Sequence, residues 1–284
     1  MYKIIKKIIL NSHVSTLLIE APLIAAKAKP GQFIILRVDN NSERIPLTIA
    51  GVDTEKGLVK IIFQVVGSST YKLNQLKEND FIQDFAGPLG KPTELEHLKN
   101  VLVIGGGVGC AIALPIAEYL HKNNCNVTSI IGFKNKDLII LEEDFKKCSN
   151  ELVLTTDDGS YGFKGNCVDA MKPLLEKEKY DEIICIGPLI MMKNVCAITN
   201  KLNLSIFICF FFICFTSFLI KSFVIIQLLF QLQFFFFVLL QIIFLILYLH
   251  QLLFYNVLLL FFDIQLHCLL SFEVPLYTLY DIYS

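Results

Sequence analysis

The sequence predicts an antiparallel β-barrel, followed by an α/β domain with a parallel sheet and then an apolar tail. Three observations predict this class. Short β-branched runs separated by turn residues occupy the first hundred positions, and strand-like runs alternate with helix-like runs over the next hundred. All 15 glycines precede residue 201, whereas 17 of the 24 Phe follow residue 200. We therefore expect three segments, with bounds at 1–98, 99–202 and 203–284.

The barrel segment shows strands at regular intervals. Four runs are predicted strands, with turn residues at 29–31, 39–41 and 55–57 between them: Ile4–Leu10, Ser15–Glu20, Phe33–Val38 and Val59–Val66. A further strand closes with Arg44–Ala50, and a helix is predicted over Tyr71–Leu76. The run 87–92 is rich in Gly and Pro, so we expect the joint between the two domains there.

The second segment alternates between strand and helix patterns. Predicted strands lie at Val101–Ile104, Val127–Ile131, Glu151–Leu154 and Ile183–Ile186. Predicted helices follow the first three strands, the first running through Leu120 and the others over Leu138–Lys147 and Val168–Glu178. This order is typical of βαβ units that build a parallel sheet.

Composition excludes several classes of protein. The 25 basic and 26 acidic side chains leave a net charge of −1, so no excess of cations is present to neutralise a nucleic acid. Lys3, Lys6 and Lys7 interrupt the first ten residues, which argues against a secretory signal. None of the nine cysteines forms a CxxC pair. We expect reduced, mostly buried thiols and a cytoplasmic protein.

The tail carries few charges. The runs 204–220 and 222–262 contain no Asp, Glu, Lys or Arg, and each is long enough to span a bilayer. Membrane association through residues 204–262 is therefore one interpretation. A shifted reading frame is another, indicated by the lack of Gly and the Phe, Leu and Ile bias. A buried helical domain is the third, although such helices ordinarily show polar faces.

Three loops at strand ends are candidate binding sites. The strand Val101–Ile104 runs into Gly105-Gly106-Gly107-Val108-Gly109 and then a helix, an arrangement that lets the backbone and helix N–H groups approach a pyrophosphate. A glycine turn without a ligand is the alternative. The loops 155–165 and 187–192 follow the third and fourth strands. An ordinary polar turn and core filling by Met191 and Met192 are their alternatives.

The barrel segment offers two further candidates. Arg44 and Thr48 place a cation and a hydroxyl close together on one strand. Gly67-Ser68-Ser69-Thr70 precedes the predicted helix, and hydroxyl residues there either cap the helix or bind a phosphate.

In chain order, the motifs ERIPLTIA, GPLGKP, GGGVG, NKDL, TDDGSYG and GP-x-x-MM resemble those of the ferredoxin–NADP reductase superfamily. Residues 1–202 look most like the small FAD- and NAD(P)-binding subunit of NADH-dependent ferredoxin:NADP oxidoreductases, also called sulfide dehydrogenase. The electron-transfer subunit of dihydroorotate dehydrogenase is a close relative.

The resemblance implies an FAD-dependent oxidoreductase subunit, a flavoprotein that transfers hydride between NAD(P)H and flavin. It implies FAD contacts at Arg44, Pro46, Leu47, Thr48, Gly67, Ser68, Ser69 and Thr70, with the Thr48 hydroxyl near flavin N5. It implies nucleotide contacts at Gly105, Gly106, Gly107, Val108 and Gly109, with Asp157, Asp158, Gly187 and Pro188 bordering the nicotinamide end. No catalytic side chain is expected, because the hydride passes between cofactors.

The resemblance also implies partners. Electrons would pass to a larger flavin and iron–sulfur subunit, with ferredoxin as a further partner. Two alternatives stay open. One is a dihydroorotate dehydrogenase electron-transfer subunit, and the other is a truncated or membrane-associated nucleotide-binding module with no electron outlet.

The chain departs from the family pattern in three places. Ile45 holds the position, three before Thr48, where the superfamily has Arg. Lys134 and Phe163 stand where close relatives have Arg, so NADP is favoured over NAD only slightly. The Cys-rich segment that binds a two-iron two-sulfur cluster in the family has no match, because Cys209, Cys214 and Cys268 lack neighbouring glycines. We therefore expect no metal and an activity impaired by the tail.

Overall fold

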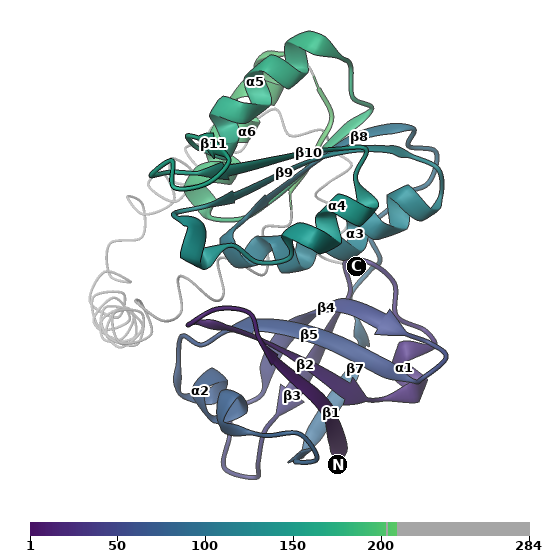
Figure 1. Ribbon diagram of the computed structural model, residues 1–284. Helices are drawn as coiled ribbons and strands as arrows, with labels where there is room; N and C mark the ends of the chain where they lie inside the picture. Colours follow the sequence, from purple (N-terminus) through teal and green to yellow (C-terminus); the bar gives the residue numbers. More distant parts are fainter. Residues whose placement is uncertain (203, 209–284) are drawn as a thin grey trace, which may run out of the picture. The chain divides into compact units, whose positions relative to one another are not determined.

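The computed structural model describes residues 1–202 and 204–208. A seven-stranded antiparallel sheet forms the first part (Figure 1). Its elements are β1 (Tyr2–Ile9), β2 (Val14–Glu20), α1 (Pro22–Ala25), β3 (Phe33–Arg37), β4 (Ile45–Asp53), β5 (Leu58–Gln64), α2 (Ser68–Gln75), β6 (Phe81–Ile82) and β7 (Asp84–Leu89). The strand order is β6-β1-β2-β5-β4-β3-β7. The edge strands β6 and β7 flank Gln83, so the two ends of the sheet meet and the barrel is nearly closed.

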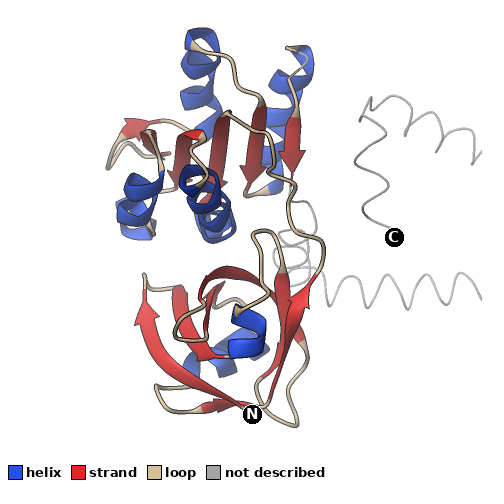
Figure 2. Ribbon diagram, turned by 90° about the vertical axis from the view of Figure 1, so that its right-hand side faces the viewer, coloured by secondary structure: helices blue, strands red, loops and turns tan. Residues whose placement is uncertain are grey.

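Burial alternates along the barrel strands, as the pleat requires when one face packs inward. In β3, Ile34 and Leu36 are buried while their neighbours are half-buried. They pack with Leu17, Ile61 and Phe63 from other strands. Figure 2 shows these strands in red and their strong curvature. The predicted barrel therefore rests on an apolar core of its own.

The second part is a six-stranded parallel sheet in the order β11-β10-β9-β8-β12-β13. Its elements are β8 (Asn100–Gly106), the 3-10 turn η1 (Gly107–Gly109), α3 (Cys110–Lys122), β9 (Asn126–Phe133), the 3-10 turn η2 (Lys136–Leu138), α4 (Glu142–Cys148), β10 (Glu151–Thr156), β11 (Phe163–Lys164), α5 (Cys167–Lys177), β12 (Glu182–Ile186), α6 (Leu189–Lys201) and β13 (Ile206–Ile208). Helices α3 and α4 cover one face of this sheet, and α5 and α6 cover the other (Figure 1).

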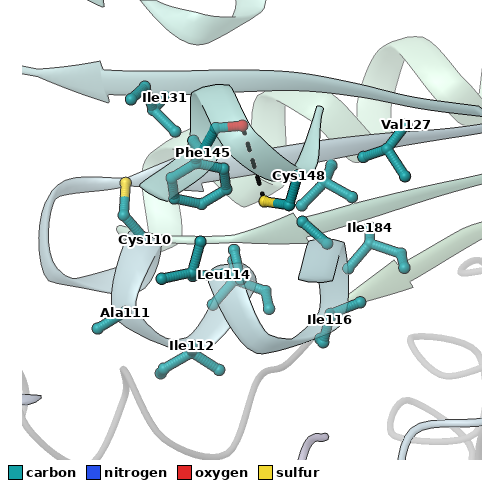
Figure 3. Packing of buried hydrophobic residues seen from close by; sticks show 14 of the residues in the cluster. Cys110, Ala111, Ile112, Leu114, Ile116, Val127, Ile131, Phe145, Cys148 and Ile184 are labelled. Atoms are coloured by element: carbon teal, nitrogen blue, oxygen red, sulfur yellow. Dashed lines mark hydrogen bonds between the residues drawn. The ribbon is translucent and has the colours of Figure 1, made fainter. Parts of the chain in front are cut away.

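Helix α3 is buried almost throughout. Cys110, Leu114 and Ile116 pack with Phe145 and Cys148 of α4 and with the sheet (Figure 3). The same cluster takes in side chains of the barrel, from β2, β4 and β5: Val14, Ala50 and Ile62. One apolar core therefore joins the helix that follows the glycine turn to the barrel strands.

The predicted fold class is confirmed, and the structure corrects several local bounds. Helix α4 begins at Glu142 rather than at Leu138, because Leu141 adopts a left-handed conformation with φ of 61°. Gly87-Pro88-Leu89 belongs to β7 rather than to a linker, and the connection runs over 90–99. Ile206–Ile208 was expected in the apolar tail, but it pairs in parallel with β12 and extends the sheet.

The predictions for the rest of the tail, and for Cys209, Cys214 and Cys268, lie outside the described residues. Among residues 1–202 and 204–208, no helix is long and apolar enough to cross a membrane. The same residues contain no group of three or more side chains placed to hold a metal ion. The cysteines described there are free thiols, and all are buried except the half-buried Cys196.

Candidate functional site

Two arginines converge on one carboxylate beside β4. Arg44 lies directly before this strand, with an exposed guanidinium whose Nη2 is 3.4 Å from Asp84 Oδ2. Arg37 on β3 brings Nε to 2.7 Å from the same oxygen, in an ion pair whose N–H is not aligned as a hydrogen bond. The group therefore carries a net positive charge. Sequence reasoning missed Arg37, because only the β3–β7 register places it opposite Asp84.

Pro46, Leu47 and Thr48 lie within β4, where they pair with β3. Leu47 faces the barrel core. Thr48 is 8% exposed, and its hydroxyl forms no hydrogen bond with any other described residue. A hydroxyl left in this way can donate to or accept from a bound ligand.

The first turn of α2 contains the predicted hydroxyl motif. The helix begins at Ser68 rather than at Tyr71, so Ser68, Ser69 and Thr70 lie inside it. Thr70 Oγ1 accepts hydrogen bonds from the Val66 and Gly67 N–H groups, each at 3.0 Å, so this hydroxyl caps the helix. The N–H groups of residues 68–70 have no acceptor among the described residues. Such unpaired N–H groups at a helix start favour an anion.

Gly67 provides a test of whether a phosphate fits there. A Cβ built on Gly67 would meet nothing within 4 Å. Its φ of −155° is extended and open to any residue, so the backbone conformation does not demand glycine. The space beside the unpaired N–H groups of α2 is therefore open, which fits the close approach of a pyrophosphate.

The glycine turn after β8 combines one open position, Gly107, with tightly packed ones. Gly107 has a φ of +55° and nothing within 4 Å of its Cβ position. A Cβ on Gly106 would lie 2.7 Å from Met191 Sδ and 2.9 Å from Pro188 Cδ, and one on Gly109 would lie 2.5 Å from the Ile186 oxygen. Gly106 and Gly109 thus allow the turn after β12 to pack against the glycine turn.

The loops that follow β9 and β10 are bonded to each other. The Asp157 N–H donates to the Phe133 oxygen at 3.1 Å, and the Asp158 N–H donates to the Lys134 oxygen at 3.3 Å. The Lys136 N–H donates to Ser160 Oγ at 2.8 Å. These bonds give both loops a fixed shape at the carboxyl edge of the sheet.

Ser160 also acts on the neighbouring carboxylate. Its hydroxyl and N–H donate to Asp158 Oδ1 at 2.6 and 2.9 Å. These hydrogen bonds favour the charged form and lower the pKa of Asp158. The contact between Ser160 and Lys136 was not predicted, since their loops meet only once β9 and β10 are paired.

The structure does not bring Asp157 and Asp158 beside Gly187 and Pro188. The former follow β10 and the latter follow β12, with β9 and β8 between them in the sheet. Three strand spacings amount to roughly 14 Å. The two pairs therefore flank the glycine turn on opposite sides, a separation that suits an extended dinucleotide along the carboxyl edge of the sheet.

Comparison with known proteins shows which family shares this architecture. No family model matches the chain. A Thermotoga maritima protein named dihydroorotate dehydrogenase B (NAD(+)), electron transfer subunit homolog, is 43% identical over 67% of this chain and 67% of its own length. A solved NADH-dependent reduced ferredoxin-NADP oxidoreductase is 39% identical with a TM-score of 0.69, over 73% of this chain and 75% of that one. The chain belongs to the ferredoxin–NADP reductase superfamily.

Two further matches extend the comparison. An uncharacterized protein from the adh 3' region of Clostridium beijerinckii is 46% identical over 72% of each chain. The Amycolatopsis cytochrome P450 reductase GcoB is 18% identical with a TM-score of 0.60, over 73% of this chain and 68% of its own, and shares the fold. The resemblance drawn from the sequence motifs is confirmed.

Proposed function

We propose that this chain is an FAD-dependent oxidoreductase subunit that takes hydride from NAD(P)H and passes electrons to a partner. One observation carries the proposal. The chain presents an open anion-binding helix start on a barrel, at α2, and an open glycine turn on a parallel sheet, at η1 and α3. The superfamily gives these two features to a flavin and a nicotinamide nucleotide. When bound, the flavin supplies the hydride-accepting ring system.

The barrel residues suit FAD. Arg44, with Arg37 beside it, supplies positive charge for the phosphates, and residues 67–70 supply N–H groups and space. The Thr48 hydroxyl, unpaired within the described chain, would interact with the flavin ring, while Pro46 and Leu47 hold that part of β4 in place. No side chain here needs to act as a nucleophile or a general base.

The sheet residues suit the nicotinamide nucleotide. Gly105, Gly106, Gly107, Val108 and Gly109 would hold its pyrophosphate against the start of α3. Gly187 and Pro188, which pack on this turn, would border the nicotinamide. Asp157 and Asp158 lie on the other side of the turn, where the distant ribose of an extended nucleotide would reach.

The partner we propose is a larger flavin and iron–sulfur subunit. Several relatives bear the name electron transfer subunit of dihydroorotate dehydrogenase B, including one from Desulforamulus reducens at 36% identity. That name supports assembly with a second subunit that uses the electrons. Ferredoxin is a second candidate acceptor. The free, mostly buried thiols of the described residues support a cytoplasmic location.

A spectroscopic experiment tests the function. The purified full chain should be yellow, and its flavin absorbance should bleach when NADH or NADPH is added without oxygen. The relative rates with the two nucleotides identify the preferred donor. A colourless protein that takes up no added FAD, or a flavin that neither nucleotide reduces, would overturn the proposal. Reduction that never reaches the partner subunit would favour a nucleotide-binding module without an electron outlet.

A further inference from the structure

Lys7 of β1 reaches the C-terminal end of α2. Its Nζ donates to the backbone oxygen of Asn74 and, at 3.0 Å, to that of Leu76. The last carbonyls of a helix have no donors within the helix, and a cation beside them is favourable because of the helix dipole. Lys72, the basic residue in the last turn of α2, lies instead near Asp39 and Ser42, at 3.5 and 3.4 Å.

A second contact ties the same end of α2 to the barrel. Ser15 of β2 is 2% exposed, and its hydroxyl donates to Asn74 Oδ1 at 2.7 Å. Helix α2 spans Ser68–Gln75, eight residues, and helices of this length are marginal without tertiary contacts. Its direction is therefore set by the groups that hold its ends.

The opposite end of α2 is the candidate phosphate site. The unpaired N–H groups of residues 68–70 all point along the helix axis, so a change in the tilt of α2 moves all of them together. A side chain that fixes the C-terminal end thus acts on a ligand at the N-terminal end without touching it.

We propose that Lys7 is a positioning residue for the FAD pyrophosphate: by holding the last carbonyls of α2, it aims the first-turn N–H groups at the phosphates. This inference rests on the proposed function, because it takes FAD as the ligand of α2. It assigns to β1, which carries none of the predicted site residues, a part in cofactor affinity.

The test uses full-length apoprotein and compares three variants. Lys7→Met keeps most of the aliphatic stem and removes the charge and donors, so the dissociation constant for FAD should rise about tenfold, or about 1.4 kcal/mol. Lys7→Arg keeps a cation and should stay close to wild type. Lys6→Met is the matched control. Lys6 is exposed on the same strand, and its side chain forms no hydrogen bond or ion pair with the described residues, so its loss should leave FAD binding unchanged.

A spectroscopic readout separates positioning from general stability. At saturating FAD, the phosphorus NMR signals of the bound pyrophosphate should shift in Lys7→Met and return to the wild-type position in Lys7→Arg. Equal FAD affinity in Lys7→Met and Lys6→Met, or unshifted phosphorus signals in a weakened Lys7→Met, would overturn the inference. If Lys7→Met does not fold, Ser15→Ala replaces it, and unchanged affinity and signals there would count against the inference in the same way. A wild-type chain that binds no FAD would instead refute the proposed function.

Discussion

Thr48 has a polar group that the described part of the chain does not use. Its neighbours on β4 pack or pair with other residues, whereas its hydroxyl has no hydrogen-bond partner among the described side chains and backbone groups. Nearly buried polar groups are usually paired in proteins. A bound flavin would supply the missing partner.

Thr48→Val removes this hydroxyl and keeps the branched shape. We expect flavin reduction by NAD(P)H to slow about tenfold, as the loss of one hydrogen bond of about 1.4 kcal/mol would cause. Anaerobic stopped-flow mixing measures the rate. Thr48→Ser retains the hydroxyl and should react close to wild type. Equal rates in Thr48→Val and the wild type would remove Thr48 from the flavin site.

Two glycines give opposite expectations. Gly67→Ala meets no atom of the protein within 4 Å, so the unfolding temperature should not change, but the added methyl group should weaken FAD binding by obstructing the phosphates. Gly109→Ala places a Cβ 2.5 Å from the Ile186 oxygen. Overpacking of this kind costs about 1–3 kcal/mol, so unfolding temperature and nucleotide affinity should both fall. Thermal unfolding with FAD and NADH titrations distinguishes the cases, and undiminished FAD affinity in Gly67→Ala would place the phosphates elsewhere.

At the scale of elements, the strands were predictable where local pattern decides them. The strands β2, β3 and β9 were predictable because their runs of β-branched and apolar residues are typical of strands that are buried on one or both faces. The start of α4 depends on the left-handed Leu141, which no helical periodicity reveals. Strand β13 spans Ile206–Ile208 and pairs with β12. Its short apolar sequence does not differ from the apolar residues around it, so only this tertiary contact identifies the strand.

Asp181 joins two central strands of the parallel sheet. Its Oδ2 accepts hydrogen bonds from the N–H groups of Lys99 and Asn100 at 2.8 and 2.9 Å. The Asn100 and Lys99 N–H groups hold the pKa of Asp181 below its ordinary value. Because the folded pKa is lower than the unfolded one, this stabilisation is present above the ordinary Asp pKa of about 3.9 and is lost as the pH falls below it.

We therefore expect Asp181→Asn to lower the free energy of unfolding at pH 7 and the difference from wild type to shrink as the pH falls below about 4. Urea unfolding at several pH values measures both. Asp137→Asn is the control, because this carboxylate forms no hydrogen bond or ion pair with the described residues. A difference that stays constant down to pH 3 would mean that the hydrogen bonds to Asp181 do not need its charge.

At the scale of the molecule, the motifs identified the candidate site residues, but the sequence does not contain their arrangement. Gly106 and Gly187 were expected near one ligand, and the structure packs them together. Asp157 and Gly187 were both expected to border the nicotinamide end, and the strand order places β9 and β8 between their strands. The order of strands depends on how the connecting helices cross the sheet, so the sequence around Asp157 or Gly187 does not reveal which strands lie between them.

The cysteine positions in the full sequence also predict the iron content of the purified protein. Cys209 and Cys214 lie five residues apart in a run without glycines, and Cys268 is distant in sequence from both, so the glycines of a tight cluster loop are missing. After incubation with iron and sulfide, the purified chain should hold far less iron than one cluster requires. It should still reduce a small dye with NAD(P)H. Stoichiometric iron, measured by metal analysis, would contradict this expectation.

Helix α3 has a mechanical consequence for the contact between the two sheets. Its first residue, Cys110, directly follows the glycine turn, and the helix shares a dry core with Val14, Ala50 and Ile62 of the barrel. Separating α3 from the barrel strands would expose these side chains to water. The apolar contact between α3 and the barrel strands therefore resists any motion that would separate the start of α3 from these side chains.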